Sequence, residues 1–221
     1  MDFLNSRHLT SQDGYVHPFR QPGEFAYSAL LSDVTRATES GIIIVGGDGV
    51  PEGTGTQHDI VFHWDSAARR FMPRESDMKL TIRPNDFVMF QFDAAVPGQP
   101  PCFILVQGKE SIEGDSSRLK THDAFTHFFL SPGEYAYRLG EATYRISVAD
   151  HRSMSEREHQ RQTEQPLVIM VNGNNVSVPH GRIVTGQTVI WAVERGEDVH
   201  VEGLMGKANN PPATGSTPSP R

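Results

Sequence analysis

The ten histidines of this chain are its first candidates for chemistry, because an imidazole can bind a metal ion or transfer a proton. Two places bring histidine and carboxylate close together in the sequence: His122, Asp123 and His127 in one segment, and His200 and Glu202 in another. On a strand, His122 and His127 fall on opposite faces, whereas His200 and Glu202 share a face. A Cu²⁺ or Zn²⁺ site would therefore have to be assembled across strands.

Packing is the competing interpretation of these histidines. His17 and His127 each alternate with aromatic residues, which is typical of a strand with an apolar face (Tyr15 and Phe19 around one, Phe125 and Phe129 around the other). A buried histidine usually finds a hydrogen-bond partner rather than a metal ion. We therefore predict no catalytic residue and no bound cofactor, and we retain the five residues above only as candidate ligands for copper or zinc.

The composition argues against several classes of function. The net charge is −7 and no run of lysine or arginine occurs, so a nucleic-acid groove is not expected. Cys102 is the single cysteine, which excludes an intrachain disulfide and a cysteine-rich zinc site. The glycine-rich stretch 46–56 lacks the Lys-Ser/Thr of a phosphate-binding loop, and we expect a flexible crossing there.

The first residues do not have the pattern of a secretory leader, because no basic start precedes an apolar run. No stretch of the chain approaches the roughly 20 apolar residues of a membrane span. We expect a cytoplasmic protein, with an exported mature chain as the alternative.

One segment of eleven residues occurs twice. "HPFRQPGEFAY" begins at His17 and "HFFLSPGEYAY" begins at His127, and Asp13 and Asp123 precede them at the same spacing. Agreement at this density predicts a duplicated unit. Proline fixes φ and glycine permits a positive φ, so each Pro-Gly-Glu is expected to be a turn that leads into a strand.

Strand signals dominate the rest of the chain as short apolar segments between turn residues, which is typical of an all-β sandwich or barrel. Only Ser28–Thr38 and Asp150–Gln165 have a helix-like pattern. The second of these has almost no apolar face, and we expect a solvated linker. Residues 206–221 are rich in Pro, Ser and Thr and are predicted to be a disordered tail.

A second similarity links the middle of the chain to its C-terminal part. The segments "IVFHWDSAARRFMP", "KLTIRPNDFVMFQF" and "CFILVQG" parallel "LVIMVNGNNVSVP", "GRIVTGQTVIWAV" and "DVHVEG", with Trp191 at the place of Phe90. Joined to the Pro-Gly-Glu segments, these halves resemble the cupredoxin family. The resemblance covers residues 12–203 almost throughout.

This resemblance implies an all-β fold with two cupredoxin-like Greek-key β-sandwiches. Residues 57–150 carry both halves in the family's order and would form a central unit. Residues 10–48 and 166–205 carry them in reverse order and would form a second unit from both chain ends. Because a half-sandwich has an open edge, the ends must pair within the chain or with another copy by strand exchange.

The type-1 copper ligands of cupredoxins are missing from their usual places. Neither Arg138–Tyr144 nor Ser28–Ser40 contains Cys, His or Met, and Cys102 comes too early to supply the thiolate. The resemblance then implies a copper-free module that binds a protein partner or serves as a structural subunit of a larger assembly, such as a redox or membrane-associated complex. The alternative is a copper- or zinc-dependent enzyme or carrier with His and carboxylate ligands.

Overall fold

The computed structural model describes residues 4–31, 40–47, 55–93 and 99–204. This part of the chain is almost entirely β, as the sequence predicts, with one α-helix. The strands are β1 (Asp13–Pro18), β2 (Gly23–Leu31), β3 (Gly41–Val45), β4 (Gln57–Asp65), β5 (Arg70–Pro73), β6 (Lys79–Ile82), β7 (Phe87–Phe92), β8 (Cys102–Gln107), β9 (Ile112–Asp115), β10 (Ala124–Phe128), β11 (Gly133–Leu139), β12 (Ala142–Ala149), β13 (Leu167–Asn172), β14 (Asn175–Val176), β15 (His180–Val184), β16 (Thr188–Arg195) and β17 (Val201–Leu204).

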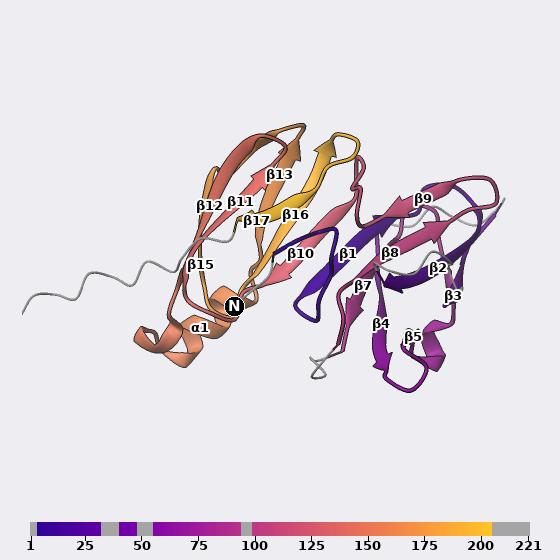
Figure 1. The fold of residues 1–221 in the computed structure, drawn as a ribbon, viewed down its shortest axis with the longest axis horizontal. Helices are drawn as coiled ribbons and strands as arrows, with labels where there is room; N and C mark the ends of the chain where they lie inside the picture. The colour runs from indigo at the N-terminus through magenta and orange to yellow at the C-terminus, as the bar shows by residue number, and fades with distance from the viewer. Residues whose placement is uncertain (1–3, 32–39, 48–54, 94–98, 205–221) are drawn as a thin grey trace, which may run out of the picture.

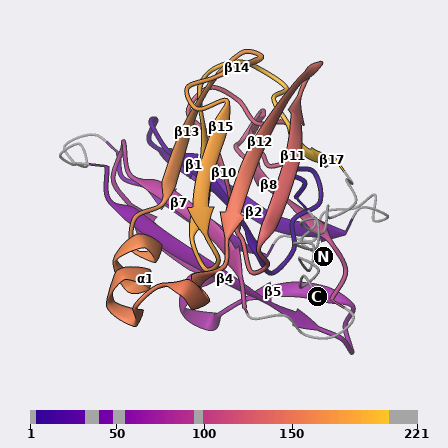
Figure 2. The ribbon, with the colours of Figure 1, turned by 90° about the vertical axis from the view of Figure 1, so that its left-hand side faces the viewer.

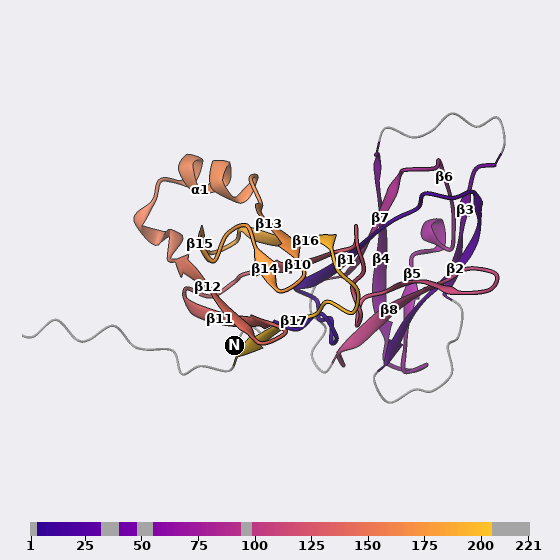
Figure 3. The same ribbon diagram turned by 90° about the horizontal axis from the view of Figure 1, so that it is seen from above.

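Three sheets of mixed direction build two sandwiches that lie side by side (Figure 1). The large sheet has eight strands in the order β14-β13-β16-β10-β1-β7-β4-β5 and runs through both sandwiches. One half of it faces the small sheet β6-β3-β2-β8-β9, and the other half faces the small sheet β15-β12-β11-β17. We call these the N-terminal sandwich (β1–β9) and the C-terminal sandwich (β10–β17); they meet where β1 pairs with β10 (Figure 3).

The same pairing pattern occurs in both sandwiches. Antiparallel β2 and β3 correspond to β11 and β12, and the parallel pairs β3–β6 and β4–β7 correspond to β12–β15 and β13–β16. Each Pro-Gly-Glu segment leads into a strand, β2 or β11, as predicted. Phe90 lies opposite Tyr15, and Trp191 lies opposite Phe125, so these positions correspond as the sequence suggested. Among the described residues no strand corresponds to β9.

The halves pair in chain order, which differs from the expected arrangement. Strands β1–β3 pair with β4–β9, and β10–β12 pair with β13–β17. The expected units, residues 57–150 and residues 10–48 with 166–205, would instead place β10 beside β7 and β1 beside β16. The physical reason is that β1 and β10 have nearly the same side-chain pattern, so the sequence pattern suits either neighbour and cannot choose between them.

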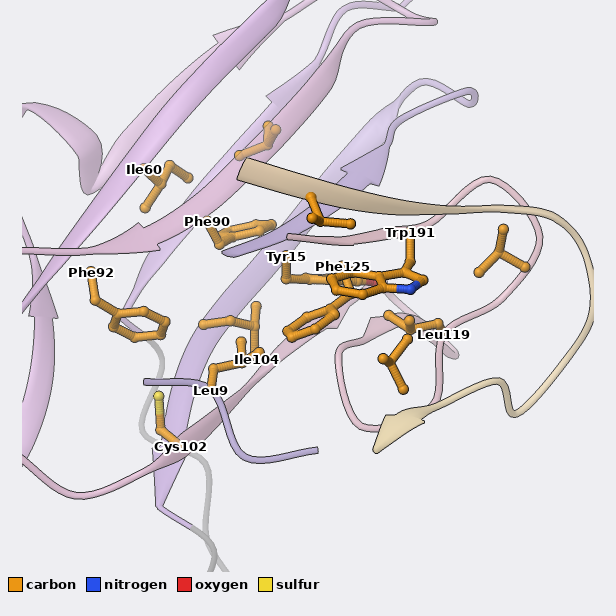
Figure 4. Close-up of a cluster of buried hydrophobic side chains, with 14 of the residues drawn as sticks. Leu9, Tyr15, Ile60, Phe90, Phe92, Cys102, Ile104, Leu119, Phe125 and Trp191 are labelled. Atoms are coloured by element: carbon orange, nitrogen blue, oxygen red, sulfur yellow. The ribbon is translucent and has the colours of Figure 1, made fainter. Parts of the chain in front are cut away.

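Both small sheets cover the same face of the large sheet. Tyr15, Phe125, Phe90 and Trp191 lie directly opposite one another across four neighbouring strands, and all four are fully buried (Figure 4). Residues that lie directly opposite each other on neighbouring strands have their side chains on the same face of the sheet, in parallel and antiparallel pairs alike. One apolar core therefore continues from one sandwich into the other.

The segment between β12 and β13 contains the helix α1 (Glu156–Thr163), which lies outside the core (Figure 2). Ser155 caps it by accepting a hydrogen bond from the Glu158 N–H, and none of its residues is buried. This agrees with the expected solvated linker. The other run with a helix-like pattern was misread, because its first part, Ser28–Leu31, continues β2. Residues 32–39 lie outside the described residues, as do much of the glycine-rich crossing and the predicted tail 206–221.

No helix in the described residues is long and apolar enough to cross a membrane.

Two neighbouring residues of β13 test which face of the large sheet is the core. Ile169 is fully buried and Val168 is 45% exposed. We expect Ile169→Ala to lower the free energy of unfolding by about 2–5 kcal/mol, since it removes buried groups and leaves a cavity. Val168→Ala should cost under about 1 kcal/mol. Urea unfolding of both variants measures the difference, and equal losses would contradict this register.

Candidate functional site

The junction of the two sandwiches contains the predicted candidates Asp123 and His127. In the antiparallel pair of β1 and β10, Tyr15 lies opposite Phe125 and Asp13 lies opposite His127. Because corresponding residues meet at the centre, the two strands are related by an approximate two-fold axis that passes between Tyr15 and Phe125. Each histidine of the repeated motif therefore meets the aspartate of the other sandwich.

Two reciprocal His–Asp pairs result from this pairing. The Nδ1 of His127 lies 2.7 Å from Oδ1 of Asp13, and the Nδ1 of His17 lies 2.7 Å from Oδ1 of Asp123. The first pair is fully buried; in the second pair the side chain of His17 is 11% exposed. A carboxylate accepts hydrogen bonds, so Nδ1 is the donating nitrogen in both pairs.

The backbone preceding each strand holds the second oxygen of each carboxylate. The N–H and the hydroxyl of Thr10 donate to Oδ2 of Asp13, each at 2.7 Å. In the C-terminal sandwich the N–H of Lys120 donates to Oδ2 of Asp123 at 2.9 Å. Both aspartates are thus fixed in position before they meet the histidine of the other strand.

Burial dominates the electrostatics of this junction. Burial raises the pKa of Asp13 above its ordinary value, although the hydrogen bonds from His127 and Thr10 act in the opposite direction. Burial, followed by the nearby charge of Asp123, raises the pKa of Tyr15 well above the ordinary value for a tyrosine. Tyr15 therefore stays a neutral phenol at any physiological pH.

The five candidate metal ligands are not brought together. Asp123 and His127 are both buried, but each is paired with a residue of β1 rather than with the other. His122 is exposed at the rim of a cavity, and Glu202 lies on β17, where it accepts a hydrogen bond from Arg138 at 2.6 Å. The Nδ1 of His200 lies 3.2 Å from a guanidinium nitrogen of Arg7. Within the described residues, no three His, Cys, Asp or Glu side chains are grouped so as to hold a metal ion.

Cys102 begins β8 and is fully buried. Its backbone pairs with that of Leu9, and burial raises the pKa of its thiol well above the ordinary value. A thiol with this pKa stays protonated, whereas a metal ligand or a nucleophile must be a thiolate. The surroundings of Cys102 are those of a core residue.

The outer face of the large sheet, which no small sheet covers, is the second notable feature. Two rows of side chains cross it from β13 to β7 without a charge: Met170, Ala192, Ala124, Val16 and Met89 in one, and Val168, Ile190, Thr126, Gly14 and Gln91 in the other. Val168 is 45% exposed, and Met170 and Phe128 are each 38% exposed. An antiparallel sheet with one face in water normally alternates apolar and polar residues.

Sequence reasoning missed both the His–Asp pairs and the apolar outer face. The equal spacing of Asp13 and Asp123 from the two histidines was the signal for the pairs, but it acquires meaning only once β1 and β10 are known to be neighbours. The runs "LVIMV" and "TVIWAV" were the signal for the outer face, since near-continuous apolar strands indicate burial on both sides.

Comparisons with known proteins find no family model, no curated protein and no solved structure that matches this chain. The likeness to cupredoxins therefore stays an interpretation of the sequence. The two sandwiches can still be compared with each other, because their corresponding positions show where one differs from the other.

Removing the carboxylate of Asp13 should destabilise the chain strongly. Asp13→Ala leaves the buried Nδ1–H of His127 and the N–H of Thr10 without an acceptor, which we expect to cost about 3–5 kcal/mol of unfolding free energy. The control is Glu202→Ala, which breaks the exposed pair with Arg138 and should cost at most about 1 kcal/mol. Denaturant unfolding measures both, and a small effect of Asp13→Ala would contradict the pair's structural role.

Acid should favour the folded chain through Asp13. Because the folded pKa is raised above 3.8, protonation of Asp13 contributes stability that is complete below pH 3.8 and is lost as pH rises through the folded pKa. Relative to Asp13→Asn, which cannot titrate, the wild type should therefore lose unfolding free energy as pH rises across this range. Urea unfolding at a series of pH values measures this difference, and a difference that grew in favour of the wild type would contradict the raised pKa.

Proposed function

We propose that this chain is a copper-free, cupredoxin-like, protein-binding subunit, and that it docks through the outer face of the large sheet. The observation that supports this proposal is the uncharged apolar surface over β13, β16 and β10, where Val168, Met170 and Phe128 are exposed. The largest contiguous apolar patch on a soluble monomer is typically about 300–600 Å², and it is often functional.

Internal comparison supports a role for the C-terminal half of this face. Ile60 lies opposite Phe90 as Ile169 lies opposite Trp191, so Asp59 corresponds to Val168. The N-terminal sandwich thus carries a charge where the C-terminal one carries valine. Because Asp59 occupies the corresponding position, packing of the fold does not require an apolar residue there. The apolar side chain of Val168 occurs in only one of the two sandwiches, and this favours a binding role.

The occupant that this surface fits best is a second copy of the chain. A partner that buried a charge against the two uncharged rows would find no opposite charge within them, which is costly, whereas the same two rows of a second copy bring no charge. Strand spacing makes the patch about 19 Å across five strands, and its area is on the order of 300–500 Å². This is below the roughly 800 Å² per partner of a standard interface, so we expect a weak, reversible dimer.

Stacking of two such faces leaves every strand pair intact. Strand exchange, the other route to self-association, would require β1 to leave its place between β7 and β10. That step would expose Tyr15 and break both His–Asp pairs. Face-to-face stacking is therefore the form of self-association that we propose.

Matched lysine substitutions test this proposal. Val168→Lys places a charge in the patch and should abolish the dimer, because the charge would be buried without a partner. Asp59→Lys, at the corresponding position of the N-terminal sandwich, should leave the dimer unchanged. Sedimentation velocity over a range of concentrations measures the monomer–dimer equilibrium, and circular dichroism confirms the fold of each variant.

Two outcomes would contradict the proposal at different levels. A wild type that stays monomeric at every concentration rules out the second copy as the occupant. Suppose that a photo-crosslinker at position 170 then also captures no protein in the cells that make this chain, and that one at position 59 captures none either. The protein-binding function itself is then wrong.

A further inference from the structure

A cavity of about 880 Å³ lies next to His17 in the N-terminal sandwich. Its walls come from the end of β1, the turn from Arg20 to Phe25, the hairpin of β8 and β9, and Thr121 and His122 from the segment before β10. This volume is within the range of small-molecule sites. The outer face of the large sheet is on the other side of β1, so the cavity is separate from the proposed docking surface.

The ring of His17 reaches this cavity with one nitrogen unused. Its Nδ1 donates to Asp123, and no described residue forms a hydrogen bond with its Nε2. In the neutral ring Nε2 then carries a lone pair and accepts hydrogen bonds. Since His17 is only 9% exposed, its position is fixed by burial while one atom stays open to a ligand.

His127 shows that this opening is specific to the N-terminal sandwich. It forms the same bond to an aspartate, and its ring packs edge-on against Phe129 as that of His17 packs against Phe19, yet its Nε2 is buried without a partner. The N-terminal sandwich differs by β9, which has no counterpart among the described residues. Gly114 of β9 lies over the ring, because a Cβ there would come within 2.9 Å of Nδ1 of His17.

The lining of the cavity indicates the chemistry of a ligand. Asp123 lies behind His17, and Glu113 is half-buried in the wall, so the inner part of the cavity is acidic. The cations Arg20 and Lys109 are exposed at the rim, where water screens them. Phe25 is half-buried and supplies an apolar wall, with the buried ring of Phe19 packed against it edge to face at 5.2 Å.

We propose that this cavity binds a small primary amine with an apolar body. The ammonium group donates a hydrogen bond to Nε2 of His17 and is attracted by Asp123 and Glu113, and the apolar part lies against Phe25. Asp123 acts as a positioning residue, because its bond to Nδ1 fixes the ring and keeps Nε2 as the accepting atom. His122 stands at the entrance.

Nuclear magnetic resonance of the full-length chain, with benzylamine as the probe, tests this assignment. Benzylamine should shift the imidazole signals of His17 and the amide signals of Gly23 and Gly108 saturably, with a millimolar Kd as expected for so small a ligand. The signals of His127 should not move. Phenol, which lacks the charge, should bind at least several-fold more weakly, and inorganic phosphate should not bind.

The assignment is overturned if benzylamine causes no saturable shift at these residues. Saturation by phenol or phosphate in preference to benzylamine overturns it equally, because the site would then select a neutral donor or an anion.

Two variants connect the binding to the named residues. In His17→Asn the side-chain amide can still donate to Asp123 but no acceptor replaces Nε2, and the affinity for benzylamine should fall at least tenfold. Glu113→Gln changes a wall residue outside the junction and should weaken binding several-fold with the fold intact. Glu202→Gln, remote from the cavity, is the control. An unchanged affinity in Glu113→Gln overturns the proposal even where His17→Asn does not fold.

Discussion

The pairing of β1 with β10 is the interaction on which the whole architecture depends. It joins two four-stranded halves into one eight-stranded sheet and makes one continuous core from two sandwiches. The two His–Asp pairs fix its register, because Asp13 meets His127 and His17 meets Asp123 in one alignment only. A slip of β1 by one residue would turn Asp13, Tyr15 and His17 to the outer face, away from the core and from their partners at β10. Buried polar pairs are known to fix register in other folds, and the raised pKa of Asp13 reflects the desolvation of its carboxyl group at this junction.

The approximate two-fold axis makes the differences between the sandwiches informative. At the axis itself Tyr15 faces Phe125, and its hydroxyl lies 3.2 Å from Nδ1 of His17, a neighbour that His127 lacks. The N-terminal sandwich has the cavity and a charged outer position at Asp59. The C-terminal sandwich has the sealed histidine and the apolar patch at Val168. The exposed apolar side chains of the proposed docking face, Val168, Met170 and Phe128, therefore lie in one sandwich and the cavity lies in the other.

Much of the fold follows from the sequence, whereas the partners of the strands do not. Alternating and continuous apolar runs predicted nearly all strands, and the correspondence of Trp191 with Phe90 held in the structure. The assignment of halves to sandwiches failed because β1 and β10 present almost the same residues to β7 and β16. Ser28–Leu31 was misread because its apolar spacing suits a helix as well as a strand. Of the candidate ligand residues, Asp123 and His127 are buried and Glu202 lies on β17, whereas His122 and His200 lie just outside the strands. Their grouping depended on a strand neighbour that local pattern does not contain.

A buried histidine beside an aspartate can be structural or can serve a ligand, and this chain contains both cases in one junction. Their bonds to the carboxylate are equally short, so the pair alone does not decide between the two roles. What differs is the second nitrogen. At His127 it is enclosed by the core, which leaves an unsatisfied polar atom as a cost of the symmetric junction. At His17 the β8–β9 hairpin and the Pro-Gly-Glu turn leave space at the ring, so that the same cost can be relieved by water or by a ligand. The junction whose two His–Asp pairs fix the strand register thus also contains a nitrogen that is available for binding.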